Sequence, residues 1–442
     1  MVHVQSQRGI DVHMACRAPS EPLRPFRHWP RPVQSSTIVT AQNKVVVMTS
    51  AAREQFRRIA SLDIVRGIAM VLMAIDHVRV YSGLPPGGPT PGIFFTRWVT
   101  HFVAPAFVFL AGTGAYLLGT KLGDKRTLSR FLVTRGIWLI FLELTVLRIA
   151  WTFNFDFSHY LLAGVIWMIG WCMILLAAAV HLPVRAVGAI GVAIIALHNT
   201  TDLFAGQLEK AFGDAGPGWL LQVLYFGGVF KLGESGPPLF VLFVIVPWIG
   251  VMMAGYAFGR AMEMDASTRR TLCLRLGVAL CALFVCLRIA GVYGDPRTWA
   301  EASTKLPSYL AFLATSKYPA SLEFLCMTLG PMFIAIAFAE QWRGRVADAI
   351  ATFGRVPFFY YLLHIPLIHA AACIVSLARE GRVNPWLFGN HPMDPGPAPA
   401  GYVWSLPLLY LVFVLCVAAL YLPCRWYARL KAARRSHWLS YL

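Results

Sequence analysis

The chain has 442 residues, of which 57% are hydrophobic and only 14% are charged, and its mean hydropathy is +0.59. Soluble globular domains carry about 25% charged residues, so this composition excludes a disordered chain, a nucleic-acid-binding arm and most soluble enzymes. It predicts an all-α, polytopic integral membrane protein whose main partner is the lipid bilayer. The formal net charge of +18 therefore needs an explanation other than nucleic-acid binding.

The first 50 residues are rich in Pro, Arg, Ser and Gln and lack the apolar core of a signal peptide. We expect residues 1–50 to form a disordered basic extension, and Met48 is an alternative start of translation. The membrane domain is expected over residues 58–425, and residues 426–442 are expected to form a basic cytoplasmic tail.

Apolar segments long enough to cross the bilayer, about 20 residues each, recur along the domain. The ten candidates cover residues 62–82, 99–120, 131–151, 160–181, 184–200, 239–259, 271–293, 321–339, 357–379 and 403–424. An eleventh apolar piece, 219–230, is too short to cross and is expected to be interfacial or re-entrant.

The basic residues are distributed unevenly between alternate loops. If the first segment starts in the cytoplasm, the loops on that side hold 19 Lys and Arg residues, against seven on the other side. The seven are Arg97, Lys210, Lys231, Arg297, Lys305, Lys317 and Arg382. Because basic residues favour the cytoplasmic side, this asymmetry predicts ten crossings with both termini in the cytoplasm.

The nine cysteines are odd in number and lie mostly inside apolar segments. They are therefore interpreted as small core residues, and neither a disulfide framework nor a bound metal is expected.

The first segment carries an unusual number of ionisable residues for its depth. Asp63, Arg66 and His77 follow a spacing of three and four residues, together with two methionines, and so share one face of the helix. Each ionisable group at membrane depth costs at least roughly 2.5 to 3.5 kcal/mol at a helix centre, which indicates a role for this face. Asp76 and His77 form a candidate catalytic pair at its outer end, and simple interfacial solvation is the alternative.

Histidines at the outer ends of two other segments are further candidates. His101 enters the second segment at the same level as His77. In the fifth segment, a spacing of four residues would let Asp202 support His198 as a general base, although a loop histidine without such a role is also consistent with the pattern.

The ninth segment places Arg355 at its cytoplasmic end and His364 deeper, where the hydroxyl of Tyr360 or Tyr361 could pair with the imidazole. Other buried charges are interpreted as structural ion pairs whose partners the sequence does not assign. They are Glu143, Arg148, Arg288 and Glu323.

Several separate motifs resemble one family. They are residues 61–73 (SLDIVRGIAMVLM) with 76–79 (DHVR), 107–112 (FVFLAG), 247–256 (PWIGVMMAGY) and 354–364 (GRVPFFYYLLH). Over about residues 58–425 the chain is similar to the bacterial relatives of heparan-alpha-glucosaminide N-acetyltransferase. The resemblance implies a multi-pass acyltransferase of the bacterial inner membrane.

In that family the acyl group comes from cytoplasmic acetyl-CoA or another acyl-CoA and passes to a sugar or glycan on the far side. The resemblance therefore implies an acyl-CoA co-substrate and no bound cofactor, and related enzymes often form homodimers. The animal enzymes use a histidine of the first outer loop, but residues 82–96 here contain none, so that His77 and His101 are its nearest substitutes. Residues expected to bind acyl-CoA are Asp63, Arg66, Arg135, Arg355 and His364. The competing function is a proton-coupled transporter or flippase without acyl transfer.

Overall fold

The computed structural model describes residues 38–41, 44–47, 59–88, 90–213, 218–304, 306–389 and 396–434. The chain divides into two compact units, Met1–Arg57 and Arg58–Leu442. In the first unit, β1 (Ile38–Ala41) and β2 (Lys44–Val47) pair in antiparallel fashion. The remainder of the expected disordered extension, with Met48, lies outside the described residues, and so does the chain after residue 434.

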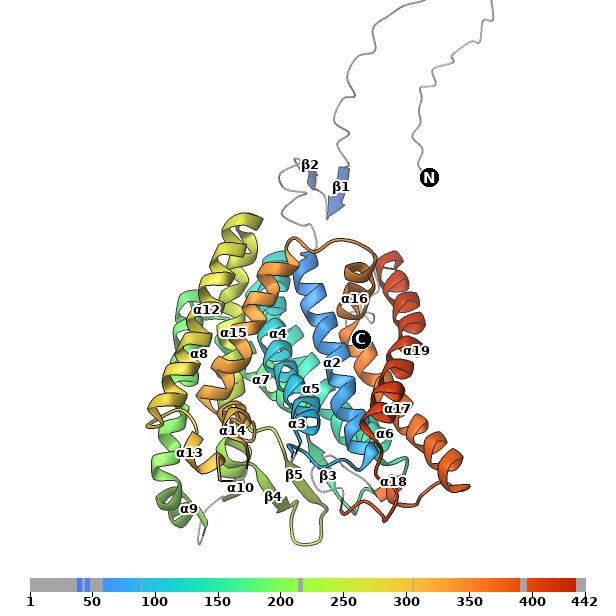
Figure 1. Ribbon diagram of the computed structural model, residues 1–442. Helices are drawn as coiled ribbons and strands as arrows, with labels where there is room; N and C mark the ends of the chain where they lie inside the picture. The colour runs from blue at the N-terminus through green and yellow to red at the C-terminus, as the bar shows by residue number, and fades with distance from the viewer. Residues whose placement is uncertain are drawn as a thin grey trace, which may run out of the picture. The chain divides into compact units, whose positions relative to one another are not determined.

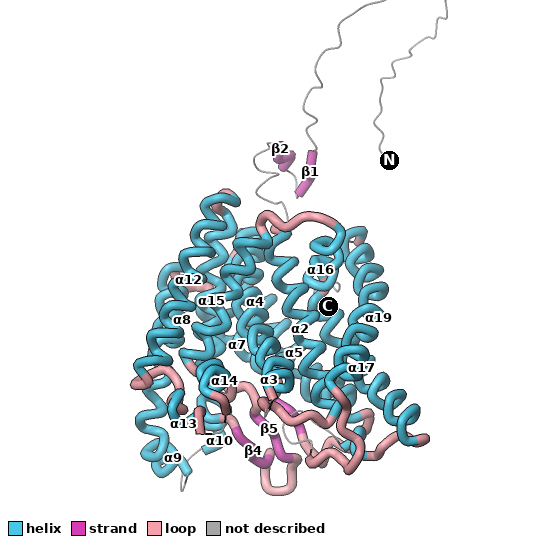
Figure 2. The backbone as a smooth tube through the Cα atoms, viewed as in Figure 1, coloured by secondary structure: helices cyan, strands magenta, loops and turns pink. Residues whose placement is uncertain are grey.

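The second unit is a bundle of helices (Figure 1, Figure 2). Its long helices are α2 (Ala60–Ser82), α4 (Val103–Leu122), α5 (Lys125–Leu142), α7 (Val165–Ala179), α8 (Val184–Leu197), α11 (Val246–Phe258), α12 (Ala266–Ala290), α15 (Leu322–Ala339), α16 (Arg345–Arg355), α17 (Pro357–Glu380) and α19 (Leu406–Ala433). Shorter helices are α3 (Pro91–Trp98), α6 (Arg148–Thr152), α9 (Ala205–Gly213), α10 (Gly218–Leu221), α13 (Trp299–Ala302), α14 (Ser308–Leu313) and α18 (Trp386–Gly389).

A helix covers most of each expected membrane segment, and six helical stretches among the described residues are long and apolar enough to cross a bilayer. These are Pro91–Leu122, Val184–Leu208, Ala266–Ala290, Leu322–Ala339, Pro357–Glu380 and Leu406–Ala433. The protein is therefore an all-α, multi-pass membrane protein. The number of ten crossings and the cytoplasmic position of both termini stay predictions.

Two expected membrane segments begin as strands rather than helices. Segment 160–181 opens with β3 (Leu161–Ala163), and segment 239–259 opens with β5 (Pro238–Val241). β5 pairs in parallel with β3 and in antiparallel fashion with β4 (Gly228–Lys231), which ends the apolar piece 219–230. In a short run of apolar residues, hydrophobic periodicity does not distinguish a strand from a buried helix. The sequence therefore did not predict these strands.

The ninth expected segment, 357–379, matches α17, and Arg355 lies before it in a separate helix. α16 ends at Arg355, Val356 leaves the helical region with φ −134° and ψ 51°, and Pro357 starts α17. A proline disfavours the helical conformation in the residue before it but fits the first position of a helix. Arg355 and His364 therefore belong to different helices.

The most closely packed helix pairs meet at glycines. A Cβ atom added to Gly112 of α4 would lie 2.0 Å from the carbonyl oxygen of Met252 in α11, and one added to Gly255 would lie 2.1 Å from that of Phe109. Four other pairs meet in the same way: Gly67 and Gly354 (α2 with α16), Gly136 and Gly170 (α5 with α7), Gly191 and Gly250 (α8 with α11), and Gly277 and Gly330 (α12 with α15). Small residues let backbones approach closely, which favours helix association where lipid is as apolar as the side chains.

We predict that Gly112→Ala lowers the thermal stability of the detergent-solubilised protein, because the new methyl group would overlap the Met252 carbonyl. Overpacking of this kind costs typically about 1 to 3 kcal/mol. Gly206→Ala is the matched control, since nothing lies within 4 Å of its added Cβ atom. Equal unfolding temperatures for the two variants would contradict the proposed role of the glycine contacts.

Candidate active site

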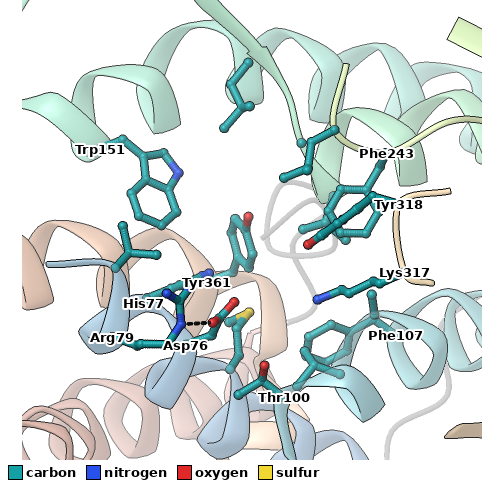
Figure 3. A pocket seen from close by; sticks show the side chains of 18 of the residues that line it. Asp76, His77, Arg79, Thr100, Phe107, Trp151, Phe243, Lys317, Tyr318 and Tyr361 are labelled. Carbon is teal, nitrogen blue, oxygen red and sulfur yellow. Dashed lines mark hydrogen bonds and ion pairs between the residues drawn. The ribbon is translucent and has the colours of Figure 1, made fainter. Parts of the chain in front are cut away.

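A cavity of about 100 Å³ lies at the C-terminal end of α2 (Figure 3). Its wall combines charged residues from α2 with aromatic residues from several other elements. Among the lining residues are Asp76, His77, Arg79, Trp151, Phe243 and Tyr361. In the predicted orientation, this end of α2 faces away from the cytoplasm.

Hydrogen bonds hold the end of α2 in place. The Tyr81 hydroxyl donates to the carbonyl of Trp151 at 2.7 Å, and the Tyr402 hydroxyl donates to the Tyr81 carbonyl at 2.8 Å. Gly83 ends the helix with φ 74°, a left-handed conformation that glycine adopts without steric cost. These contacts tie the segment after His77 to two other parts of the chain.

The His77 imidazole pairs with a second imidazole. Its Nδ1 atom lies 2.6 Å from Nε2 of His364, and the two rings are stacked with their centroids 4.7 Å apart. Trp151 packs its edge against His77 at 4.9 Å. His364 is fully buried, whereas His77 is partly exposed and lines the cavity.

The partners of His364 determine the tautomers of both uncharged rings. Nδ1 of His364 lies 2.6 Å from the carbonyl oxygen of Tyr361, which can only accept a hydrogen bond, so this nitrogen carries the proton. Nε2 of His364 is then an acceptor, and Nδ1 of His77 must donate to it. This leaves the lone pair of His77 on Nε2, an atom that has no hydrogen-bond partner among the described residues. An imidazole oriented in this way is suited to act as a general base.

This arrangement differs from the expected pairing of His364 with a tyrosine hydroxyl. The Tyr361 backbone carbonyl, rather than its hydroxyl, contacts His364, and the hydroxyl of Tyr360 is buried without a partner among the described residues. His364, which is expected among the residues that bind acyl-CoA, lies beside His77 at the cavity. The sequence did not identify this pair, because 287 positions separate the two residues.

Carboxylates approach the cavity from two sides. Oδ1 of Asp76 accepts a hydrogen bond from Nε of Arg79 at 2.8 Å, so that Asp76 is paired with a cation one turn away (Figure 3). Glu143 lies at the N-terminus of α7, where its Oε2 accepts from the backbone N–H groups of Ile166 and Trp167 at 2.9 and 3.3 Å. Glu143 opens a π-helical turn, Glu143–Leu147, and such turns recur at functional sites. From the sequence alone, Glu143 is predicted only as a member of a structural ion pair.

His101 lies outside the lining of this cavity. Both of its ring nitrogens are buried without a hydrogen-bond partner among the described residues, and its ring packs against Phe324 at 5.5 Å. The charges of Lys317, Arg97 and Asp76, which line the cavity, nevertheless act on His101.

His198 and Asp202 do not contact each other as expected. Nε2 of His198 lies 2.8 Å from the carbonyl oxygen of Ala320, and Asp202 instead accepts from the amide of Asn199 at 2.7 Å. Residues 198–204 form a 3₁₀ helix, with about three residues per turn, so residues three apart align and residues four apart do not. The four-residue spacing that suggested the pair applies only to an α-helix.

The other expected acyl-CoA contacts lie away from the cavity. Arg66 forms an ion pair with Asp63 at 3.8 Å and donates to the Leu110 carbonyl at 3.1 Å. The Arg135 guanidinium lies 5.8 Å from the centre of the Phe358 ring, and Arg355 ends α16.

Of the other buried charges, Arg288 and Glu323 form an ion pair at 3.0 Å. Arg148 and Glu143 do not pair with each other. Arg148 donates a hydrogen bond to the side-chain oxygen of Asn154 at 2.7 Å, and Glu143 accepts hydrogen bonds from backbone amides. The expected structural ion pair is thus present between Arg288 and Glu323 but not between Arg148 and Glu143.

Comparison with known proteins gives one family match. A family model described as heparan-alpha-glucosaminide N-acetyltransferase, catalytic, matches residues 58–287, just over half of the chain. No curated protein matches the chain. The matched segment contains Asp76, His77 and Glu143, whereas His364 lies beyond its end.

We predict that His77 and His364 are both protonated on Nδ1 when uncharged, because the Tyr361 carbonyl fixes the direction of the chain of hydrogen bonds. Nitrogen-15 NMR of histidine-labelled protein measures this directly, with His77→Gln and His364→Gln used to assign the signals. A His77 signal typical of an Nε2-protonated ring would contradict the assignment.

Proposed function

The chain belongs to the heparan-alpha-glucosaminide N-acetyltransferase catalytic family, and we propose that it is a membrane acyltransferase using cytoplasmic acyl-CoA. The acceptor is an amine or hydroxyl group of a sugar or glycan on the opposite side of the membrane. The observation that carries this proposal is the hydrogen-bonded chain from the Tyr361 carbonyl through His364 to His77, which leaves a basic nitrogen at the cavity. The proposed location is the bacterial inner membrane, and the positive-inside pattern supports an orientation with both termini in the cytoplasm.

The donor would approach along the face of α2 that carries Arg66 and His77. Eleven residues separate them, a helix rise of roughly 16 Å at 1.5 Å per residue. This length suits an extended pantetheine arm whose phosphates remain near the cytoplasmic cations. Met70 and Met73 lie on the same face, are buried, and give it an apolar middle section.

In the proposed reaction, Nε2 of His77 removes the proton from the attacking amine or hydroxyl. The nucleophile then forms a bond to the acyl carbon, and the tetrahedral intermediate collapses as the carbon–sulfur bond breaks. The proton passes from His77 to the departing sulfur, so that CoA leaves as a thiol and the base is regenerated. Through this cycle His364 accepts a hydrogen bond from Nδ1 of His77 and thereby stabilises the imidazolium that forms transiently.

We predict that His77→Ala lowers acyl transfer by about 10² to 10⁴-fold, as is typical when a general base is lost, while acyl-CoA binding is retained. Purified protein with labelled acetyl-CoA and a pool of amino sugars gives the measurement. His77→Gln repeats the test with less change in packing.

His101→Ala is the matched test of the second candidate histidine. His181→Ala is the control, because that histidine is exposed and does not line the cavity. Turnover by His77→Ala equal to that of the unchanged protein would remove His77 from the mechanism. Solute flux into liposomes without any dependence on CoA would favour a transporter instead.

A further inference from the structure

Two cations at the cavity, Lys317 and Arg97, form no ion pair within 4.0 Å among the described residues. We propose that Lys317 and Arg97 form an anion-binding subsite that takes a phosphate or carboxylate group of the acceptor. This inference rests on the proposed acyltransferase function, because that function defines the acceptor. The acceptor would thus be an amino sugar or sugar alcohol that carries its own negative charge close to the group that is acylated.

The charges around the cavity do not balance internally. Asp76 is already paired with Arg79, and the Glu143 carboxylate is bound by two backbone N–H groups. Within the described part of the chain, neither Lys317 nor Arg97 lies within 4.0 Å of a carboxylate oxygen, although both line the cavity. Lys317 and Arg97 act on the Asp76 carboxylate only at longer range, so that one carboxylate serves three cations. An anionic ligand would offset the remaining positive charge.

The half-buried carboxylate of Asp295 holds the segment that carries Lys317. Asp295 accepts hydrogen bonds from the Ser316 backbone N–H at 2.7 Å, the Ser316 hydroxyl at 2.9 Å and the Ser321 hydroxyl at 2.8 Å. The residues on both sides of Lys317 are therefore fixed to one anchor.

A second set of contacts fixes the same segment from the bundle. Arg288 donates to the carbonyls of Phe312, Ala311 and Ala314 at 2.9 to 3.1 Å. His198 contacts the Ala320 carbonyl just after Lys317. This support positions the lysine backbone before any ligand binds, which reduces the entropy lost on binding.

The side chain of Lys317 projects from this support into the cavity. Figure 3 shows its ammonium end pointing toward Asp76. The Nζ atom lies 5.1 Å from the centre of the Tyr318 ring and 6.0 Å from that of Phe243. Aromatic faces attract a cation without using up its hydrogen-bond donors, so the three N–H groups stay available to an anion. A guanidinium such as that of Arg97 adds planar, bidentate donation.

The acceptor is favoured over the donor as the source of the anion. The phosphates of a cytoplasmic acyl-CoA would lie near Arg66, roughly 16 Å of helix rise from His77. Lys317 and Arg97 lie at the His77 end of the bundle, beside the group that the acceptor must reach. The cations near Arg66 thus suit the phosphates of the donor, and Lys317 and Arg97 suit an anionic group of the acceptor.

Steady-state kinetics with glucosamine and glucosamine 6-phosphate as acceptors tests the subsite. Lys317→Met is expected to raise KM for glucosamine 6-phosphate by about 10 to 100-fold, the usual effect of losing a charge-assisted hydrogen bond, and to leave KM for glucosamine nearly unchanged. Lys231→Met is the matched control, since Lys231 is exposed on β4 and does not line the cavity. An equal fall in kcat with both acceptors, or weaker binding of acetyl-CoA, would overturn the proposal.

Isothermal titration separates the subsite from the enzymatic function. In the absence of acyl-CoA, glucosamine 6-phosphate is expected to bind the unchanged protein more tightly than glucosamine, and Lys317→Met or Arg97→Met should remove the difference. This result would stand even if no acyl transfer were found. Equal affinity of the unchanged protein for the two sugars would refute the subsite.

Discussion

Close backbone contact between helices is the constraint on which the rest of the structure depends. Lipid offers no hydrophobic driving force for association, so the helices are held by van der Waals packing at glycines. Gly67 and Gly354 bring α2 against α16, and a Cβ atom on Gly354 would lie only 1.8 Å from the carbonyl oxygen of Asp63. Because α2 carries Asp63, Arg66 and His77, this contact fixes one whole polar face within the bundle.

The second constraint is that each buried polar group must find a partner. Arg288 meets it by pairing with Glu323 and by donating to loop carbonyls, while His198 does so through the Ala320 carbonyl. Both sets of bonds bend the chain between α12 and α15 into one shape. Residues that looked like isolated charges in the membrane thus hold the segment that places Lys317 and Tyr318 at the cavity, and their hydrogen bonds offset the cost of burying them.

The sequence predicted the elements that depend on local spacing. The stripe on α2 and the position of His77 at its end follow from the helical period alone, and the family resemblance is confirmed by the match over residues 58–287. Contacts between distant segments were not accessible in this way, which is why the partner of His77 was unknown. Spacing also misled where the helix type changed, as it did for His198 and Asp202 in the 3₁₀ turn.

Residues whose role comes from a loop were the hardest to identify. Lys317 counted only as one of seven basic residues on the outer side, because nothing in its neighbours reveals that Asp295 and Arg288 anchor its segment. Glu143 was visible as a buried charge, yet its place at the start of α7 depends on a tertiary contact. For both residues, the role depends on contacts with residues distant in the sequence, which residue type alone does not reveal.

The π-helical turn between α5 and α6 sets the direction in which the side chains of α6 point. Five residues, Glu143–Leu147, occupy one wide turn, which inserts one residue relative to a regular α-helix. Each residue of an α-helix advances the side-chain direction by about 100°, so a regular helix here would rotate α6 by that angle. Trp151 would then leave the edge of His77, and Arg148 would leave the Tyr160 carbonyl. One extra residue in a single turn thereby keeps Trp151 at the cavity and Arg148 at its loop carbonyl, both on the same short helix.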